Sequence, residues 1–465
     1  MADLYLSNTL SQKKEKFVPI KEGEVGIYSC GPTVYWNQHI GHMYAYVQWD
    51  ILVRFLRSQG NKVKWVMNLT DVGHLVSDED EGEDKMEKGA KREGLTVWQI
   101  ADKYIAQFKD SLKLLNVTTP DVLCRATEHI PEQIELIKKI EKNGFTYKTK
   151  TGLVFDTSKF PGYANFARLN LEEQNAGARV EVDPEKKKPW DFLLWVTNQP
   201  SHIMKWDSPW GVGFPGWHIE CTAMSVKYLG ERFDIHTGGK EHIPIHHTNE
   251  IAQAYGAFHH QTANYWLHNE WLLIDNQKMS KSSGNMITAQ DLVVRGVDPL
   301  AMRYLILTSH YKQGMNFTQQ SLAGAEKALG NAKLQISNAK LNTRHELSEE
   351  KLAQVDGYRE KFYAALANDL NTPQAIAVLW DMLKSNIPSE DKYDLAMTFD
   401  EVLGLNLGKE DKIVTPKEIT ELGEQREELR KEGKYAEADG VRLKIEKLGY
   451  KILDTKDGVK YEKVH

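Results

Sequence analysis

The chain has 465 residues, of which 41% are hydrophobic and 27% are charged. A length of this order predicts several domains with buried cores. No stretch approaches the roughly eighteen apolar residues of a membrane span, and three cysteines are too few for a disulfide framework. We therefore expect no membrane partner and a reducing, cytoplasmic setting. The formal net charge of -6 excludes a uniformly basic nucleic-acid binder but leaves a local RNA-binding surface open.

The N-terminal part alternates between strand and helix patterns. Residues 24–30 predict a short buried strand, residues 41–58 a helix, and residues 62–70 a second strand. A strand, a crossover helix and a second strand predict a parallel βαβ unit, in which ligands bind beyond the carboxyl ends of the strands. Cys30 and Thr70 lie at those two ends.

Changes of pattern along the chain predict an α/β protein in consecutive segments. A Rossmann-type parallel sheet is split by an insertion, and a helical bundle and a small α+β module follow it. The expected segments are 1–129 for the first half of the sheet domain, 130–205 for an inserted connective module and 206–262 for the second half. They continue with 263–322 for a stem-contact region that carries the sequence KMSKS, 323–408 for the helical bundle and 409–465 for the terminal module. An Asp457-Gly458 pair predicts a hairpin in the last of these.

The first motif with chemical meaning is His39-Ile40-Gly41-His42, between a predicted strand and a predicted helix. A helix N-terminus presents unpaired N–H groups and partial positive charge, and two imidazoles one turn apart add donors for a triphosphate. Gly41 lets a nucleotide approach the backbone closely. We predict a nucleotide-phosphate site here, with ordinary cap and surface histidines as the alternative.

The second motif is Lys278-Met279-Ser280-Lys281-Ser282, which combines two lysines with small hydroxyl residues. Lysine is a compact positive charge that can neutralise a departing pyrophosphate, and small residues let a loop close over phosphates. A polar surface loop is the alternative for any single segment of this kind. The two motifs together resemble the paired signatures of class I aminoacyl-tRNA synthetases.

Four further residues are candidate metal ligands: Cys30, Cys221, His246 and Glu250. His246 and Glu250 are four residues apart, which places both side chains on one face of a helix. Two thiolates, an imidazole and a carboxylate form a plausible zinc site. The residues alone leave open inert core cysteines and a surface His–Glu hydrogen bond, because the ligands are scattered and no CxxC motif is among them.

The complete set of motifs resembles the cysteinyl-tRNA synthetase family. The matching blocks run in family order between residues 30 and 310 and include SCGPTVY, HIGH, NLTD, PGWHIECTAMS, HHTNEIAQ, KMSKSSGN and RYLILTSHY. The resemblance implies one zinc ion per chain in the amino-acid pocket, with Cys30, Cys221, His246 and Glu250 as its ligands. A substrate thiolate is a far better zinc ligand than the hydroxyl of serine, which gives the metal a role in selecting cysteine.

The resemblance also implies the reaction. L-cysteine and ATP, with Mg²⁺, form cysteinyl-adenylate and pyrophosphate, and the cysteinyl group then passes to the terminal adenosine of tRNA-Cys. His39, His42 and Lys281 are expected to stabilise the phosphate transition state, with Lys278 in the same catalytic set and Gly41 against the ATP. No side chain stands out as the base for the transfer step.

Two pocket residues and two departures from the family pattern complete the expectations. Thr70 matches a position in the family's amino-acid pocket, and the alternative is a structural hydrogen bond at a strand end. Trp217 is expected to pack over the bound amino acid, and the alternative is an aromatic residue of the core. Glu241 either takes the place of an aspartate near the substrate amine or is simply solvated. Residues 77–91 differ from the family's usual run and receive no role.

The C-terminal third is implied to bind tRNA, with the terminal module at the anticodon and Tyr461 either stacking on a base or packing in the hairpin. We expect a monomer. One alternative is the related ligase of mycothiol synthesis, which joins cysteine to an amino-sugar inositol and generally lacks the terminal module. The other is a catalytically silent RNA-binding paralogue, which would need none of the intact motifs together.

Overall fold

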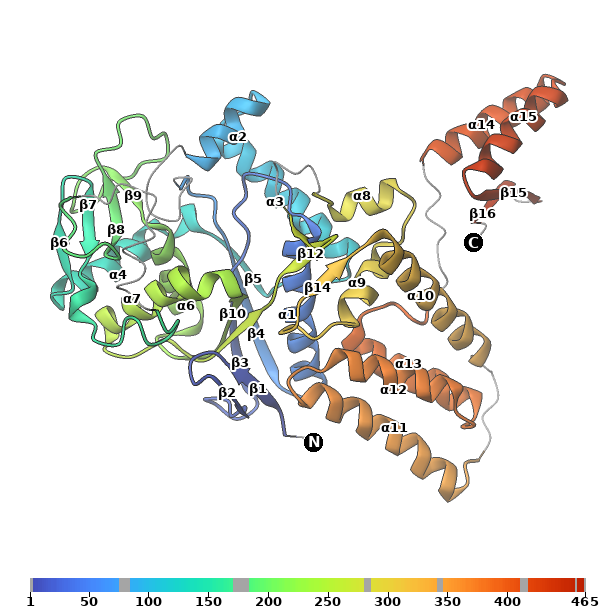
Figure 1. Ribbon diagram of the computed structural model, residues 1–465, viewed down its shortest axis with the longest axis horizontal. Helices are drawn as coiled ribbons and strands as arrows, with labels where there is room; N and C mark the ends of the chain where they lie inside the picture. The colour runs from blue at the N-terminus through green and yellow to red at the C-terminus, as the bar shows by residue number, and fades with distance from the viewer. Residues whose placement is uncertain are drawn as a thin grey trace.

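The structure is a computed structural model and describes residues 3–74, 84–169, 184–279, 286–340, 346–409, 417–455 and 458–463. Its centre is a five-stranded sheet in the order β11-β10-β3-β4-β5 (Figure 1). Every neighbouring pair in this sheet is parallel, which confirms the predicted Rossmann-type core. The strands are β3 (Glu24–Ser29), β4 (Lys62–Leu69), β5 (Val122–Arg125), β10 (Phe233–Gly239) and β11 (Ala263–Asn269).

Helices cover both faces of this sheet. Along β3 and β4 alternate side chains enter two different apolar clusters: Ile27 and Trp65 belong to one, and Tyr28 and Val66 to the other. Because successive side chains of a strand point to opposite faces, the two clusters lie on opposite sides of the sheet. The first cluster contains residues of α1 (Ile40–Ser58), α2 (Lys85–Glu93) and α3 (Val97–Leu114), and the second contains residues of α4 (Ile130–Lys142), α6 (Trp217–Leu229) and α7 (Thr248–Phe258).

The insertion forms its own antiparallel sheet in the order β6-β7-β8-β9. Its helix α4 packs on α6 and α7, so the insertion continues the second apolar cluster instead of forming a separate core. Its elements within residues 130–205 are α4, β6 (Thr146–Lys148), β7 (Gly152–Phe155), η2 (Thr157–Lys159) and β8 (Phe192–Thr197). A short helix, η1 (Ala126–His129), precedes this range, and the last strand of the sheet, β9 (Gly213–Pro215), lies beyond its predicted end.

Smaller elements border the central sheet. An antiparallel pair, β1 (Tyr5–Asn8) and β2 (Lys13–Lys16), precedes it, and a three-stranded sheet in the order β13-β12-β14 follows it. The elements of this second group are β12 (Leu272–Ile274), β13 (Gln277–Lys278), α8 (Ala289–Val294), α9 (Pro299–Leu307) and β14 (Met315–Phe317).

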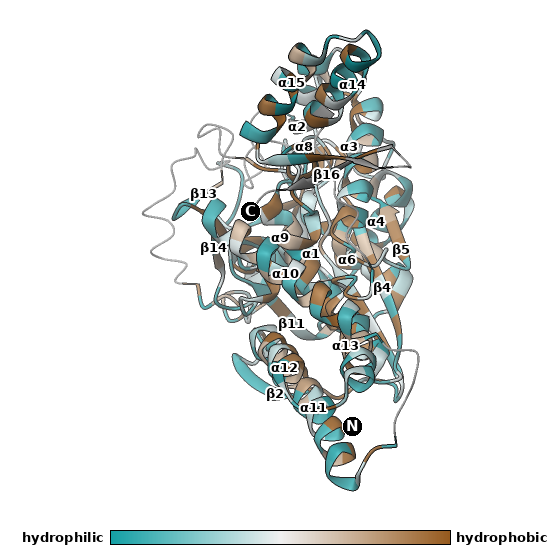
Figure 2. Cartoon of the chain, turned by 90° about the vertical axis from the view of Figure 1, so that its right-hand side faces the viewer, coloured by the Kyte–Doolittle hydropathy of each residue, from teal (hydrophilic) through white to brown (hydrophobic). Residues whose placement is uncertain are grey.

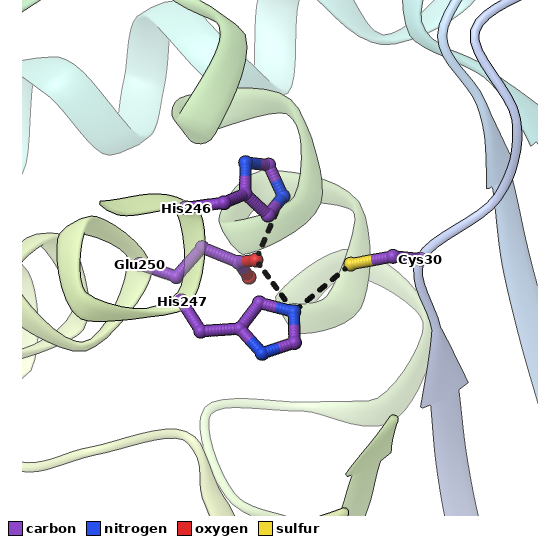
Figure 3. Close-up of side chains that lie close together, drawn as sticks. All are labelled: Cys30, His246, His247 and Glu250. Carbon is purple, nitrogen blue, oxygen red and sulfur yellow. Dashed lines mark hydrogen bonds and ion pairs between the residues drawn. The ribbon is translucent and has the colours of Figure 1, made fainter. Parts of the chain in front are cut away.

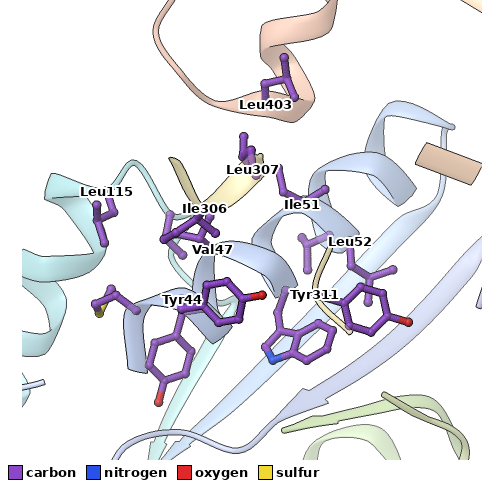
Figure 4. Close-up of a cluster of buried hydrophobic side chains, with 14 of the residues drawn as sticks. Tyr44, Val47, Ile51, Leu52, Leu115, Ile306, Leu307, Tyr311 and Leu403 are labelled. Carbon is purple, nitrogen blue, oxygen red and sulfur yellow. The ribbon is translucent and has the colours of Figure 1, made fainter. Parts of the chain in front are cut away.

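Helix α1 is the central packing element on its side of the sheet. Figure 4 shows side chains of α1, among them Val47 and Ile51, against Ile306 and Leu307 of α9 and against Leu403. The helical region that contributes Leu403 consists of α10 (Gln319–Ala339), α11 (Glu349–Ala367), α12 (Thr372–Lys384) and α13 (Ser389–Leu403). Helical packing of this region agrees with the expected bundle.

A buried ion pair joins α1 to the later part of the chain. The Arg303 guanidinium donates to Asp50 Oδ2 at 2.6 Å, and both side chains have no exposed surface. Arg303 also donates to the carbonyl oxygens of Leu403, Leu115 and Asn116. All three nitrogens of this guanidinium therefore have partners, and these partners come from several segments.

The terminal module has a small core of its own. Helices α14 (Lys417–Lys431) and α15 (Tyr435–Lys447) precede an antiparallel pair, β15 (Tyr450–Thr455) and β16 (Gly458–Lys463). Figure 2 shows hydrophilic and hydrophobic residues interspersed along α14 and α15, as in amphipathic helices. The hairpin agrees with the prediction, although Asp457 lies outside the described residues. Throughout the described part of the chain, no helix has the length and apolar character to cross a membrane.

Candidate active site

A cavity of about 520 Å³ opens where the central strands end. Its lining includes Cys30 after β3, Thr70 after β4, Gly239 at the end of β10 and Asn269 at the end of β11. The carboxyl ends of parallel strands are the usual ligand position in open α/β sheets. Most of the predicted site residues line this one cavity: Cys30, His39, Gly41, His42, Thr70, Trp217, Cys221 and His246.

A cluster of metal-binding side chains lies at one end of the cavity. Ligand atoms of Cys30, His246, His247 and Glu250 all lie within 4.8 Å of one another. Figure 3 shows the contacts: His246 Nε2 is 3.1 Å from Glu250 Oε1, and Cys30 Sγ is 3.2 Å from His247 Nε2. His246 and His247 end a π-helical turn, η4 (Ile243–His247), and Glu250 follows one turn later in α7.

Cys221, the remaining predicted ligand, lies beside this cluster. This thiol, in α6, is buried and hydrogen-bonds to the Cys30 sulfur. The structure thus places Cys221 next to Cys30, but the group whose ligand atoms all lie within 4.8 Å of one another contains His247 and not Cys221. The four predicted ligands come from three separate segments of the chain.

Burial and electrostatic interactions shift the pKa values of the two thiols and of His246 in different directions. Burial raises the pKa of the Cys221 thiol well above its ordinary value, and the neighbouring Cys30 sulfur adds to this. Burial opposes ionisation of Cys30, but the hydrogen bond from Cys221 and the nearby His247 lower the Cys30 pKa well below its ordinary value. Burial likewise opposes charge on His246, yet Glu250 and Cys30 raise the pKa of its imidazole to about 10. A thiol with a lowered pKa and an imidazole with a raised pKa therefore lie together in a buried space, beside the Glu250 side chain.

This arrangement fits a bound cation. Glu250 Oε1 is buried and accepts no aligned hydrogen bond from the part of the chain that the structure describes, although three imidazoles, those of His236, His246 and His247, lie within 3.8 Å of it. An unpaired buried carboxylate oxygen is costly, and a metal ion would satisfy it. Sulfur, nitrogen and oxygen donors in this combination suit zinc.

Trp217 begins α6 and lines the cavity beside the cluster. Its ring centroid lies 4.4 Å from that of His246, at an interplanar angle of 36°. The indole is only partly buried, so it presents a face to the cavity as well as to the protein interior. Core packing and a contact with a ligand are therefore both available to it.

Thr70 belongs to a buried hydrogen-bonded chain. Its Oγ1 donates to Glu220 Oε2 at 3.0 Å and accepts from Asn68 at 3.0 Å. The other Glu220 oxygen lies 2.5 Å from His74 Nε2. Burial raises the pKa of the Glu220 carboxyl, against the opposing effect of His74. Thr70 thus both lines the cavity and is held from behind by Glu220.

The two motif histidines lie at the start of α1. His39 is the N-cap residue, and its ring stacks on that of His42 with 3.7 Å between centroids. Burial lowers the pKa of His39 to about 4 and that of His42 well below its ordinary value, so both imidazoles are neutral near neutral pH. A Cβ added at Gly41 would lie 2.3 Å from the end of the Met279 side chain, which shows how closely the two predicted nucleotide motifs approach each other.

The second motif is described only in part. The backbone of Lys278 ends β13 and Met279 follows it, whereas the Lys278 side chain and residues 280–285, including Lys281, lie outside the described residues. Of the predicted loop at 77–91, residues 77–83 also lie outside, and the remainder belongs to α2 apart from its N-cap residue Asp84.

Glu241 lies at the exposed rim of the cavity, where its Oε2 accepts a hydrogen bond of 2.9 Å from Trp271 Nε1. Four further residues of the site were not predicted from the sequence: His247, His236, Glu220 and His74. The doubled histidine at 246–247 was a visible signal for the first of these. The others have no local sequence signal, because only the sheet and α6 bring them to the cavity.

Comparisons with known proteins identify the family of the chain. A family described as tRNA synthetases class I (C) catalytic domain matches residues 16–327, and a DALR domain matches residues 361–386. A solved structure of Mycobacterium tuberculosis methionyl-tRNA synthetase bound by methionyl-adenylate shares the fold, with a TM-score of 0.58 at 16% identity over 82% of this chain and 90% of that one. The chain belongs to the class I tRNA synthetases.

Curated relatives narrow the family further. A cysteine–tRNA ligase of Treponema denticola is 43% identical over 97% of this chain and 98% of its own length. A cysteine–tRNA ligase of Burkholderia lata is 45% identical over 98% of this chain and 96% of its own length. A cysteine–tRNA ligase of Thermus thermophilus is 39% identical over 98% of this chain and 99% of its own. Within the class I synthetases the chain therefore belongs to the cysteine–tRNA ligases, as the motifs predicted.

Proposed function

We propose that the chain acts in the cytoplasm as a monomer that activates L-cysteine with ATP and transfers it to the 3′-terminal adenosine of tRNA-Cys, with one zinc ion selecting the substrate thiol. The observation that carries this proposal is one cavity that joins the Cys30–Cys221–His246 cluster to the histidines at the N-terminus of α1. A carboxylate and an α-phosphate must meet for activation, and this cavity has space for both next to these groups.

In this proposal Cys30, Cys221, His246 and Glu250 hold the metal. When bound, zinc supplies a soft Lewis acid for the substrate sulfur, a site that serine's hydroxyl cannot use equally well. The protons of Cys221 and His246 must leave before these groups can act as ligands, so loading weakens as the pH falls. His247 Nε2 donates to the Cys30 thiolate, and its Nδ1 lies 2.7 Å from His268 Nε2, which holds the imidazole and so fixes the position of the thiolate.

Selection of cysteine by the metal removes the need for a separate editing site. A hydrophobic pocket separates similar side chains by only about 1–3 kcal/mol, which is why some synthetases edit their products. Trp217 covers the amino-acid side of the cavity, and Thr70, oriented by Glu220, offers a hydroxyl oxygen to the substrate.

The nucleotide lies at the start of α1. Because His39 and His42 are neutral, they act as hydrogen-bond donors to phosphate oxygens and add no charge. Positive charge then comes from the helix N-terminus, from Lys278 and Lys281, and from Mg²⁺ that accompanies ATP. Gly41 has no side chain to hold the nucleotide away from the backbone.

The later segments, 323–408 and 409–465, bind the tRNA in this proposal. A DALR domain match within α11 and α12 and the separately packed terminal module support it. Tyr461 packs on the small core of that module, which favours hairpin packing over base stacking. The presence of the module disfavours the ligase of mycothiol synthesis, which generally lacks it.

Cysteine-dependent ATP–pyrophosphate exchange by the purified full chain tests the proposal, run beside serine and with zinc content measured on the same sample. Exchange with cysteine alone, one zinc in the Cys30 cluster and charging of tRNA-Cys are expected. Exchange without charging would favour the amino-sugar ligase, and no exchange by folded protein would favour the silent paralogue.

A further inference from the structure

A second group of metal-binding side chains lies away from the cavity, where the insertion meets α2. Asp84 is the N-cap residue of α2: its Oδ1 accepts from the backbone N–H groups of Met86 at 2.6 Å and Glu87 at 2.9 Å. His202 belongs to the segment that leads to β9. Ligand atoms of Asp84, Glu87 and His202 lie within 4.8 Å of one another.

The second oxygen of Asp84 faces this group. His202 Nδ1 lies 2.9 Å from Asp84 Oδ2 and 3.8 Å from Glu87 Oε1. The Asp84 side chain is only 4% exposed and that of His202 only 3%. The His202 ring stacks on Phe214, with 3.8 Å between centroids, so packing holds its orientation.

Two buried atoms of the group have no hydrogen-bond partner among the described residues: Asp84 Oδ2 and His202 Nε2. The short Nδ1–Oδ2 approach therefore lacks the alignment of a hydrogen bond. A buried carboxylate oxygen without a donor is costly, since it has lost its water and gained no partner. The aspartate cannot turn away, because its other oxygen caps α2.

We propose that Asp84, Glu87 and His202 form a second metal site, which takes a divalent transition-metal ion such as Zn²⁺. One imidazole nitrogen and two carboxylate oxygens, with a position left for water, match the three-ligand form of zinc coordination. The Glu87 side chain is 23% exposed and gives the ion a path from solvent. The donors contain no sulfur, which separates this site chemically from the Cys30 cluster.

An ion there would connect three segments. Besides α2 and the insertion, the strand-end segment after β4 touches the site: a Cβ added at Gly73 would lie 1.9 Å from Asp84 Oδ2. His74 follows Gly73 and contacts Glu220, which holds Thr70 in the cavity. The ion would therefore fasten the insertion to the wall of the amino-acid pocket.

Zinc binding to three single variants of the full chain tests the site: Asp84→Asn, His202→Gln and Glu87→Gln. Asparagine is as good an N-cap as aspartate, so Asp84→Asn removes the charged ligand and keeps α2 capped. Asp298→Asn is the matched control, since Asp298 caps α9 by accepting from Leu300 N at 2.9 Å. We expect each of the three variants to bind Zn²⁺ at this site at least about 100-fold more weakly than the parent chain, and the control to match the parent.

Titration with Co²⁺ tells the two sites apart, because cobalt at a thiolate cluster gives sulfur-to-metal charge-transfer absorption and cobalt at a nitrogen–oxygen site does not. The three variants should lose only the binding phase without charge transfer. Failure of the Cys30 cluster to bind metal would remove the charge-transfer phase and leave this test intact. Equal zinc content and equal cobalt titrations in the parent chain and in every folded variant would overturn the proposal. Because the Glu87 side chain is partly exposed, Glu87→Gln should fold even if a variant at a buried ligand does not. Its metal binding can then still be compared with that of the parent chain.

Discussion

Replacement of Asp50 by alanine should destabilise the protein strongly. Asp50 is fully buried on α1 and accepts from Arg303 at 2.6 Å, from Arg54 at 2.7 Å and from the backbone N–H of Thr118 at 2.9 Å. Burial opposes ionisation of this carboxyl, but Arg303 and Arg54 lower its pKa below the ordinary value. It is therefore charged in the folded protein and balances the buried charge of Arg303.

The expected magnitude follows from what remains after the substitution. Arg303 keeps its three carbonyl partners but loses the carboxylate to which it donates, and the Thr118 N–H loses its acceptor. Removal of one member of a buried ion pair costs about 3–5 kcal/mol. Asp356→Ala is the matched control, because Asp356 pairs with Arg359 at the exposed surface, where an ion pair contributes about 1 kcal/mol or less.

Urea unfolding of the two variants and the parent measures these differences in the free energy of unfolding. In the double variant Asp50→Ala/Arg303→Met neither charge of the pair remains, so we expect it to recover about 2 kcal/mol relative to the sum of the single changes. A loss for Asp50→Ala no larger than for Asp356→Ala, or strict additivity in the double variant, would refute this account of the ion pair.

Three further predictions concern the site. Cys221→Ser should lower both the bound zinc and the cysteine-dependent exchange, because a hydroxyl is a poor zinc ligand. Cys124→Ser is the control at a buried thiol outside the cluster and should change neither quantity. An undiminished zinc content in Cys221→Ser would show that Cys221 is not a ligand. Burial lowers the pKa of His39 from 6.5 to about 4, so between these values the unfolded chain binds a proton that the folded chain does not, and stability falls as the pH falls through that window. The unfolding free energy of His39→Gln should decline less steeply there than that of the parent, and parallel profiles would contradict the burial argument. Gly41→Ala should raise the KM for ATP about tenfold, because the new Cβ would project from the helix N-terminus where the phosphates are proposed to approach the backbone. The Met279 methyl that this Cβ would meet is the end of a flexible side chain and can move aside. An unchanged KM in exchange assays would contradict a close approach of the nucleotide at Gly41.

Local patterns were sufficient to predict the first βαβ unit of the central sheet. The strand at β3, the helix at α1 and the strand at β4 follow from buried runs and helical spacing within one short stretch, and the parallel pairing of β3 with β4 agrees with the βαβ prediction. The spacing of His246 and Glu250 likewise predicted two side chains on one face, and they lie 3.1 Å apart. These features depend on neighbours in sequence, which is why the sequence contains them.

Contacts between distant segments were beyond local patterns. Nothing near His202 or Asp84 in the sequence points to the other, because the insertion returns to α2 only in three dimensions. The same holds for the chain from Thr70 through Glu220 to His74, and for His247, whose contact with Cys30 depends on the π-helical turn before α7.

The sequence by itself determined the parallel sheet, the family and the residue types of the site, because hydrophobic periodicity and motif identity are properties of short segments. Only the tertiary structure decided which of those residues share a cavity, which thiol carries the negative charge, and why His39 and His42 are neutral. Burial and proximity set these properties, and both arise when β3, α6 and η4 come together at the end of the sheet.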